Sequence, residues 1–432
     1  MHGIYSNCLG YAINNQHTII PNGDSLNGSG WYQEMAIIPA PNSQNEFYIF
    51  SVGVTSSNHG FYYSKLDLNQ NGGTGYMVQK NIQLQTDTIA DCIATVRHGN
   101  GRDWWVVVRK WRAAKRYDEI YVYLVDPNGI TQMPVQHIGG PLFSSGINRM
   151  KFSKNGEHLY NVSPYGNIHR YDFDRCNGQF LNAIFYADSA EIHVGYLDFD
   201  VSASESKIYL SLSYQSFGMG YIIQFDLTDT ANFLTSCDTI GTYYPDIVPG
   251  AVKRGPDDKI YVTGLYQFGD TCFDYLFCAS SIFPENTHIG VAPYPDSTGV
   301  ACGFQPLNFS LGTHKAYWGL PNNPNYELDT LHGSPCDTLT SVGLQDISPP
   351  KPSLHLYYHP EFQTLYVNAD QLMGKKGVVE FYTSGGQLIE TIETPVRGGY
   401  LTNSSSFALQ PSGTYLVKVR TERERLSGKF VK

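Results

Sequence analysis

The sequence is short of charged residues and has no long apolar run. Asp, Glu, Lys and Arg make up only 16% of its 432 residues, and the formal net charge is −10 at pH 7. Proteins that bind nucleic acid need basic patches to neutralise phosphates, so this acidic balance argues against a nucleic-acid partner. No run of about 18 apolar residues occurs, so we expect no transmembrane segment.

The short motifs of common enzymes and metal sites are missing as well. The chain has no Gly-x-Ser-x-Gly elbow, no His-Glu-x-x-His and no P-loop. Its eight cysteines form no tight Cys-x-x-Cys pair and no Cys/His zinc spacing. We therefore predict no catalytic residue, no metal and no cofactor. The cysteines are either buried free thiols or form one or two disulfides, such as Cys272–Cys278 or Cys302–Cys336.

Helical periodicity is almost absent, and short alternating strands take its place. Aromatic residues, 32 of them Tyr, make up 14% of the chain, and it also contains 42 Gly. This profile suits pleated strands joined by tight turns. Residues 148–174, 195–227 and 249–267 repeat one pattern: an apolar strand, a polar turn and a second strand. The pattern recurs about every fifty residues, as the four-stranded blades of a β-propeller do.

These repeats predict an all-β fold whose larger part is a six- or seven-bladed β-propeller covering residues 1–335. Segments 31–75 and 91–132 fit the blade pattern less closely, and we expect segment 301–326 to close the ring. The chain opens inside a blade, with no basic and apolar leader. We therefore expect the propeller to be N-terminally incomplete, with an outer strand and a signal peptide missing from this start site.

The composition changes after the propeller. Residues 336–352 are polar and rich in proline, which is typical of a linker. Residues 353–432 contain about seven short alternating segments separated by turns such as Ser384-Gly385-Gly386. This spacing predicts a small β-sandwich as a second domain.

The C-terminal block resembles the type A sorting domain carried by cargo of the type IX secretion system in Bacteroidetes-type bacteria. The resemblance rests on four ordered motifs, YYHP, VVEFYTSGGQLIE, LQPSGTYLVKV and GKFVK. Tyr358 and His359 replace the Pro and Asn of the family's Tyr-Pro-Asn-Pro, and one extra residue precedes the Gly of the third motif. The matching residues are Tyr357, Pro360, Gly385, Gly386, Gly413, Tyr415, Val417, Val419, Lys429, Phe430, Val431 and Lys432.

This resemblance implies export across the outer membrane, with the type IX secretion machinery as the partner of residues 353–432. The larger part carries NGDSLN, RHGNGRDWW, DFDRCNG, PDSTGVAC and GLPNNPNY, which together resemble an uncharacterised family of Bacteroidetes surface proteins with the same kind of sorting domain. That second resemblance implies architecture and export, and it brings no activity and no catalytic residue. We therefore expect a secreted or cell-surface protein.

The segment RHGNGRDWW, residues 97–105, has two interpretations. In the first, His98 acts as a base oriented by Arg102 and Asp103, or the three side chains contact a ligand at a loop end. In the second, Asn100-Gly101 is the favoured dipeptide of a tight hairpin turn between two strands. We favour the hairpin, in which the two tryptophans point to opposite faces of the strand.

Three further patterns are weaker. DLNQNGGTG, residues 67–75, imitates a calcium loop, but Val78 stands where the acidic twelfth ligand is required, so we favour a plain turn. Asp172 and Asp174 face one side of a strand, where they either bind a metal or, as we favour, form a charged blade end. The candidates for a central channel are His137, His193 and His314.

Two classes of function remain open. The first is a binding protein that presents its loops and central funnel to an unknown extracellular ligand, a glycan or a protein. The second is a propeller hydrolase or lactonase with carboxylates and histidines converging at the funnel. Propellers host both classes, so the fold does not decide between them. We favour binding, and the residues at the funnel are the discriminating observation.

Overall fold

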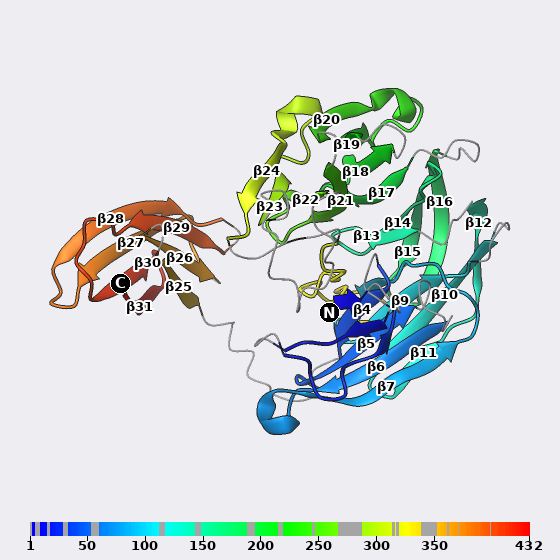
Figure 1. The fold of residues 1–432 in the computed structure, drawn as a ribbon, viewed down its shortest axis with the longest axis horizontal. Coiled ribbons are helices and arrows are strands. Elements are labelled where there is room, and N and C mark those ends of the chain that lie inside the picture. Colours follow the sequence, from blue (N-terminus) through cyan, green and yellow to red (C-terminus); the bar gives the residue numbers. More distant parts are fainter. Residues whose placement is uncertain are drawn as a thin grey trace. The chain divides into compact units, whose positions relative to one another are not determined.

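The chain forms two compact all-β units, Met1–Leu339 and Thr340–Lys432 (Figure 1). Among the residues given below, no helix has the length and apolar character needed to cross a membrane. The computed structural model describes residues 2–4, 9–14, 18–28, 33–52, 60–111, 117–142, 148–187, 195–214, 219–243, 247–266, 287–312, 316, 319–337, 352–360, 363–370, 372–397 and 399–432.

The described part of the first unit holds five antiparallel sheets of four strands, in which spatial order follows chain order and one sheet gains a fifth strand. Their strands are β4 (Met35–Pro39), β5 (Glu46–Val52), β6 (Phe61–Asp67) and β7 (Tyr76–Gln85); β8 (Ala94–Arg97), β9 (Trp104–Arg109), β10 (Tyr117–Asp126), β11 (Gly129–Gln132) and β12 (Gln136–Leu142); β13 (Arg149–Phe152), β14 (His158–Val162), β15 (Ile168–Asp174) and β16 (Gln179–Ala187); β17 (Tyr196–Val201), β18 (Lys207–Tyr214), β19 (Met219–Asp226) and β20 (Asp238–Tyr243); and β21 (Ile247–Arg254), β22 (Ile260–Tyr266), β23 (His288–Ala292) and β24 (Gln305–Ser310).

Smaller elements accompany these sheets. A separate three-stranded sheet lies near the amino end, and its residue Leu26 packs in one core cluster with Met35, Ile49 and Met77 of the first blade. Its strands are β1 (His2–Ile4), β2 (Leu9–Tyr11) and β3 (Leu26–Asn27), and the short 3-10 turns of the unit are η1 (Asn71–Gly73), η2 (Phe233–Ser236) and η3 (Gly299–Cys302).

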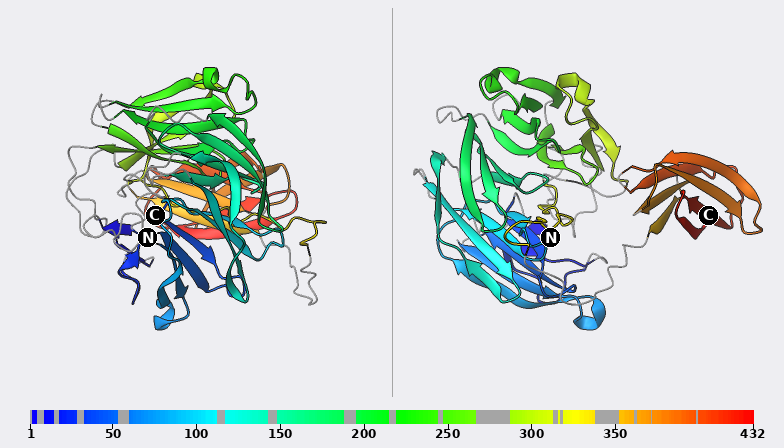
Figure 2. Two further views of the ribbon diagram at one scale, coloured as in Figure 1. Left: turned by 90° about the vertical axis from the view of Figure 1, so that its right-hand side faces the viewer. Right: turned by 180° about the vertical axis from the view of Figure 1, so that it is seen from behind.

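The five sheets are arranged as propeller blades. The first strands of successive sheets lie beside one another: β4 beside β8, β8 beside β13, β13 beside β17, and β17 beside β21. Figure 1 shows the sheets following one another around an arc with these first strands inside, and Figure 2 shows the same succession from two other directions. The predicted all-β propeller is confirmed, whereas the total number of blades stays a prediction.

Each blade packs face to face on the next through apolar side chains. One core cluster joins Phe50 and Phe61 of the first sheet to Trp104 of the second, and another joins Trp105 of the second to Phe173 of the third. Two further clusters join the third sheet to the fourth and the fourth to the fifth. Because strand side chains alternate between the two faces, one strand such as β9 serves two neighbouring cores, and all six of its residues are buried.

The turns within blades fit this close packing. In the turn between β13 and β14, Gly156 has φ of 74°, a conformation that glycine adopts at little cost. A Cβ atom at this position would lie 2.6 Å from Cγ2 of Val96 in the preceding blade. The glycine is therefore required both by the turn and by the contact between blades.

Residues 319–337, which we call the strap, run across the inner ends of the blades. Asn322 donates its side-chain N–H to the carbonyl of Ile93 at 2.8 Å, and the Tyr326 hydroxyl donates to that of Ile37 at 2.8 Å. Arg175 donates to the carbonyl of Asp329 at 2.7 Å. These contacts tie the strap to the first three blades.

A disulfide between Cys176 and Cys336 anchors the end of the strap to the third blade. The predicted bond Cys302–Cys336 is therefore wrong, because Cys302 is a buried free thiol of the fifth blade. Cys272–Cys278 lies outside the described residues. Cys336, where we expected the linker to begin, is bound to the first unit.

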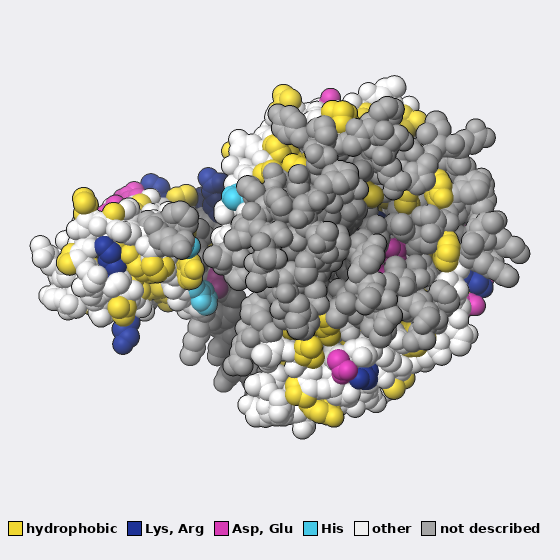
Figure 3. Space-filling model, in the orientation of Figure 1, with side chains coloured by type: hydrophobic (Ala, Val, Ile, Leu, Met, Phe, Trp, Pro, Cys, Tyr) yellow, Lys and Arg dark blue, Asp and Glu magenta, His cyan; other side chains and the backbone are white. Residues whose placement is uncertain are grey.

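The second unit consists of two antiparallel sheets, one in the order β25-β26-β29 and the other β28-β27-β30-β31. Their apolar faces enclose one core, as in a β-sandwich. Exposed hydrophobic residues remain on this unit, and Figure 3 shows such side chains on its visible surface. The strands are β25 (Ser353–His359), β26 (Thr364–Asp370), β27 (Lys376–Thr383), β28 (Leu388–Pro395), β29 (Leu401–Ser406), β30 (Thr414–Arg420) and β31 (Arg425–Val431).

Candidate functional site: a polar cluster at the inner strands

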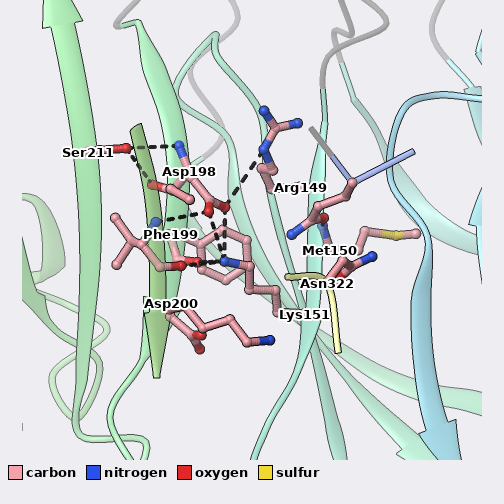
Figure 4. A network of polar contacts seen from close by, with 12 residues as sticks. Arg149, Met150, Lys151, Asp198, Phe199, Asp200, Ser211 and Asn322 are labelled. Atoms are coloured by element: carbon pink, nitrogen blue, oxygen red, sulfur yellow. Dashed lines mark hydrogen bonds and ion pairs between the residues drawn. The ribbon is translucent and has the colours of Figure 1, made fainter. Parts of the chain in front are cut away.

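Polar side chains gather where the first strands of the blades meet. We call this group the central polar cluster, and its members are Gln33, Asp91, Arg149, Lys151, Asp198, Asp200 and Lys253. They lie on or just before β4, β8, β13, β17 and β21. Figure 4 shows the side chains of Arg149 and Lys151 converging on the carboxylate of Asp198.

The carboxylates of the cluster bond to the backbone of neighbouring blades. Asp198 and Asp200 on β17 accept N–H groups of β21 at 3.0 and 2.8 Å. Asp91, before β8, accepts the N–H of Asn148, before β13, at 2.8 Å. The side-chain oxygen of Gln33 likewise accepts an N–H of β13 at 3.0 Å. These acceptors satisfy buried backbone donors that no strand within the same blade reaches, so their first role is to fasten blades together.

Lys151 joins three blades through its ammonium group. From β13 it donates to Asp198 at 3.0 Å and to the carbonyls of Phe199 on β17 and Val252 on β21, the latter at 2.6 Å. An ammonium has three N–H donors, so these contacts use all of them. The side chain retains only 11% of its possible exposure, and a buried charge is tolerated only with such complete pairing.

Arg149 lies between two buried carboxylates. Its guanidinium is 3.6 Å from Asp91 and 3.7 Å from Asp198 and is only 4% exposed. Desolvation raises the pKa of Asp91 to about 8, against the opposing attraction of Arg149 and the hydrogen bond from Asn148. A raised pKa makes the proton occupancy of Asp91 sensitive to pH in the neutral range.

Lys253 on β21 faces the strap. Its Nζ donates to the carbonyl of Asn323 at 2.9 Å. Desolvation lowers the pKa of Lys253 to about 8, opposed by the negative charge of Asp200 and assisted by the positive charge of Lys151. Lys253 has this one hydrogen bond within the described part of the chain, whereas Lys151 has three.

A pocket opens beside the cluster, between the inner strands and the start of the strap. It is narrow, with about 20 Å³ for a water-sized group, which is room for about one water molecule. Its lining residues are Gln33, Arg149, Lys151, Leu197, Asp198, Gly250, Ala251, Lys253, Gly319, Leu320, Pro321 and Asn322. In the described ranges, no group of three or more His, Cys, Asp or Glu side chains is arranged to hold a metal ion.

The segment 97–105 forms a hairpin end and lies away from this pocket. Asn100 donates to the carboxylate of Asp103 at 2.7 Å, Arg102 donates to the same carboxylate at 2.7 Å, and His98 Nδ1 accepts the N–H of Asn100 at 2.9 Å. Gly101 has φ of 75°. His98 and Asp103 are buried, and desolvation lowers the pKa of His98. The hairpin holds these groups locally, and a ligand contact by His98, Arg102 or Asp103 stays a prediction.

The two tryptophans of this segment serve separate cores, as strand alternation predicts. Trp104 packs against the first blade and meets the ring of Tyr326 in the strap edge to face at 5.9 Å. Trp105 packs against the third blade, stacks on His98 at 5.1 Å and donates its indole N–H to the carbonyl of Arg175 at 2.8 Å. Their role is to fix three blades and the strap relative to one another.

The other sequence patterns are turns or surface pairs. Asp67 accepts N–H groups of Asn69 and Gln70 within its own turn, as favoured over a calcium loop. Asp174 accepts from Cys176 and the Asn177 side chain at the turn after β15.

Of the three histidines predicted from the sequence for a central channel, His137 is the one that lies in the described residues. His137 lies on β12, the last strand of its blade, exposed and 3.0 Å from Asp118, so its proposed place in a central channel is wrong. His193 and His314 lie outside the described residues.

The sorting-domain motif falls mainly on strands of the second unit. Alternate residues of β30 point into its core, namely Tyr415, Val417 and Val419. Phe430 of β31 stacks on Tyr415 at 5.5 Å, whereas its neighbours Lys429 and Val431 lie outside the core. Lys432 donates to the carbonyl of Phe407 at 2.6 Å.

The remaining motif positions lie at strand ends and on an outer face. Gly385 and Gly386 form the turn between β27 and β28, with Gly386 at φ of 84°. Tyr357 is exposed on β25 opposite Tyr366, Pro360 follows that strand, and Gly413 precedes β30.

The central polar cluster was not predicted from the sequence. Its members come from five blades, and Lys151 and Val252, which are in contact, lie 101 residues apart. A signal is present: polar residues interrupt the apolar start of several first strands, as in QEMAI, NRMKF and LDFDV. Such interruptions also occur in half-exposed strands, so only the meeting of the strands gives them meaning.

Comparisons with known proteins add no family. No family model matches the chain, and no curated protein matches it. Among solved structures, an exo-β-1,3-galactanase from Phanerochaete chrysosporium is 8% identical, with 94% of this chain and 96% of that one covered and a TM-score of 0.36. A quinonprotein alcohol dehydrogenase-like protein from Bacteroides thetaiotaomicron is 12% identical, with 74% of this chain and 68% of that one covered and a TM-score of 0.34. The Cps50 (Swd1) β-propeller domain from Myceliophteria thermophila is 9% identical, with 87% of this chain and 96% of that one covered and a TM-score of 0.33. Similarities this remote carry no functional argument.

Proposed function

We propose that this chain is an exported or cell-surface binding protein. Its propeller binds an extracellular ligand, a glycan or a protein, and residues 353–432 direct type IX secretion. The observation that favours binding over hydrolysis is the hydrogen bonding of the three carboxylates of the central polar cluster. Asp91, Asp198 and Asp200 each accept a backbone N–H of a neighbouring blade. Acid–base hydrolysis of a glycoside needs two carboxyl groups free to exchange protons with substrate and water.

Two observations support export. The disulfide Cys176–Cys336 supports export, because disulfides persist in oxidising compartments whereas cytosolic thiols are kept reduced. The second unit also retains the alternation of the sorting-domain strand, with Tyr415, Val417 and Val419 buried and the residues between them exposed. Both are consistent with a propeller that is carried through the periplasm by its C-terminal unit.

Binding is tested with the full chain on arrays of glycans and peptides. We expect a defined group of related ligands to bind above background, with no turnover of any glycan during long incubation. A hydrolysed product that is lost on substitution of Asp198 would instead assign the hydrolase. Retention of no array member by a folded chain would contradict the binding proposal.

Export is tested by deleting residues 353–432 in a bacterium with a type IX secretion system. We expect the shortened propeller to stay in the periplasm while the full chain reaches the medium or the cell surface. A matched control replaces the exposed turn residue Arg423 with Ala, which leaves the strands of the second unit in place and secretion intact. Normal secretion of the deletion variant would refute the sorting role.

A further inference from the structure

The pocket beside the central polar cluster carries more positive than negative charge. Among its described lining residues, Arg149, Lys151 and Lys253 are cationic and Asp198 is the single carboxylate, which leaves a formal excess of two positive charges. The whole chain, in contrast, has a net charge of −10. Lys151 uses all three of its donors inside the protein, and Arg149 lies beside Asp91 and Asp198. Lys253 has one hydrogen bond within the described part of the chain, to the strap.

The single carboxylate is already neutralised from inside the protein. Asp198 accepts from Lys151 at 3.0 Å and from a backbone N–H of β21 at 3.0 Å, and Arg149 stands 3.7 Å away. Asp200, the neighbouring acid, is occupied by an N–H of β21 at 2.8 Å and one of β17 at 2.8 Å. Within the described part of the chain, neither carboxylate forms an ion pair with Lys253, whose hydrogen bond goes to the strap carbonyl of Asn323.

We propose that this pocket binds a carboxylate group of the ligand, with Lys253 as the residue that pairs with it. This inference rests on the binding function proposed above and names the chemistry that the site recognises. The pocket has room for a water-sized group, and the end of an acidic group is the part of the ligand that we place there. A carboxylate there would accept from Lys253, which has one hydrogen bond, to Asn323, within the described part of the chain.

Two sources supply such a group, a hexuronate residue of a glycan and the free C-terminus of a peptide. The experiment uses the full chain and calorimetric titration with galacturonate against galactose, and with trialanine against trialanine amide. We expect one acid to bind at least about tenfold more tightly than its neutral partner, the range of a charge-assisted hydrogen bond. The pair that shows this margin identifies the source. Equal binding by the acid and neutral members of both pairs would overturn the inference.

The variant Lys253→Gln removes the pairing charge and keeps a side chain of similar length. It should reduce the margin between acid and neutral ligand to less than about threefold, with neutral binding unchanged. The control is Lys259→Gln on the same blade, whose exposed ammonium is paired with Asp257 at 2.9 Å and lies outside the pocket lining. An unchanged margin in Lys253→Gln, in a chain that melts like the wild type, would also overturn the inference.

The pH dependence gives a second readout. Acid binding should weaken as pH rises through about 8, where Lys253, with Asp200, Lys151, Asp198 and Arg254 as the charged groups around it, loses its proton. Asp91 of the same cluster has its pKa raised to about 8 as well, so the profile is compared with that of Lys253→Gln, which retains Asp91. Neutral-ligand binding should not follow this profile. An array ligand that binds elsewhere, with no dependence on acid or on Lys253, would leave the binding function standing and remove this inference alone.

Discussion

The Lys151 ammonium on β13 lies 3.0 Å from the Asp198 carboxylate on β17, and the same ammonium donates to the carbonyl of Val252 on β21 at 2.6 Å. One side chain therefore ties three blades at their inner edge. Replacing Lys151 with Met leaves Asp198 buried without its nearest cation. We expect a loss of about 3–5 kcal/mol in the free energy of unfolding, measured by urea denaturation.

Lys154 provides the matched control for that substitution. It is three positions along in the same blade and forms an ion pair with Asp258 at 2.6 Å, but its side chain is 49% exposed. Lys154→Met should cost only about 0–1 kcal/mol, because exposed pairs are screened by water. Equal losses in the two variants would show that the inner pair does not fasten the blades.

The disulfide Cys176–Cys336 should stabilise the first unit strongly. It links two residues with a sequence separation of 160 and so restricts the unfolded chain. In the chain-entropy model, the loss of a cross-link of that span lowers the free energy of unfolding by about 5 kcal/mol. We expect the double variant Cys176→Ser, Cys336→Ser, or reductant on the wild type, to lower the melting temperature measured by calorimetry. Cys237→Ser is the control, since that thiol is exposed and unbonded. Unchanged melting in reductant would contradict the role of the bond.

The stability of the wild type should carry a pH dependence from Asp91. Its pKa is raised from 3.8 to about 8, so its contribution to folding is fully present below pH 3.8 and declines until the pH passes about 8. Asp91→Asn removes this titration. We expect the free energy of unfolding of the wild type to fall relative to the variant by about 1–3 kcal/mol between pH 5 and pH 7. If the difference in free energy of unfolding between wild type and variant is the same at the two pH values, Asp91 does not titrate between them.

Gly101 and Gly333 offer a paired test of how the strap sits on the second blade. Both have φ of 75°, but a Cβ at Gly101 would lie 2.1 Å from Oγ1 of Thr330, whereas a Cβ at Gly333 meets nothing within 4 Å. Gly333→Ala should cost only the backbone strain of about 1–2 kcal/mol. Gly101→Ala should cost about 1–3 kcal/mol more, since the strap must move. Equal melting temperatures of the two variants would contradict the contact between Gly101 and the strap.

Local patterns in the sequence were sufficient for the elements of this fold. Asn100-Gly101 between apolar runs predicted the hairpin, and alternation predicted that Trp104 and Trp105 serve opposite faces. The repeat of strand, turn and strand predicted blades, because each blade is made of consecutive segments. These predictions depend on residues close together in the chain, whose geometry the backbone fixes directly.

The inner site was decided only by the tertiary structure. Lys151, Asp198 and Val252 belong to three blades, and Cys336 forms its disulfide with Cys176 rather than with Cys302. Sequence spacing cannot rank such pairs, because their approach depends on how whole sheets stack around an axis. By itself the sequence determined the kind of blade that forms. The stacking of blades decided which charges are buried, which are paired, and that Lys253 lines a pocket beside the strap.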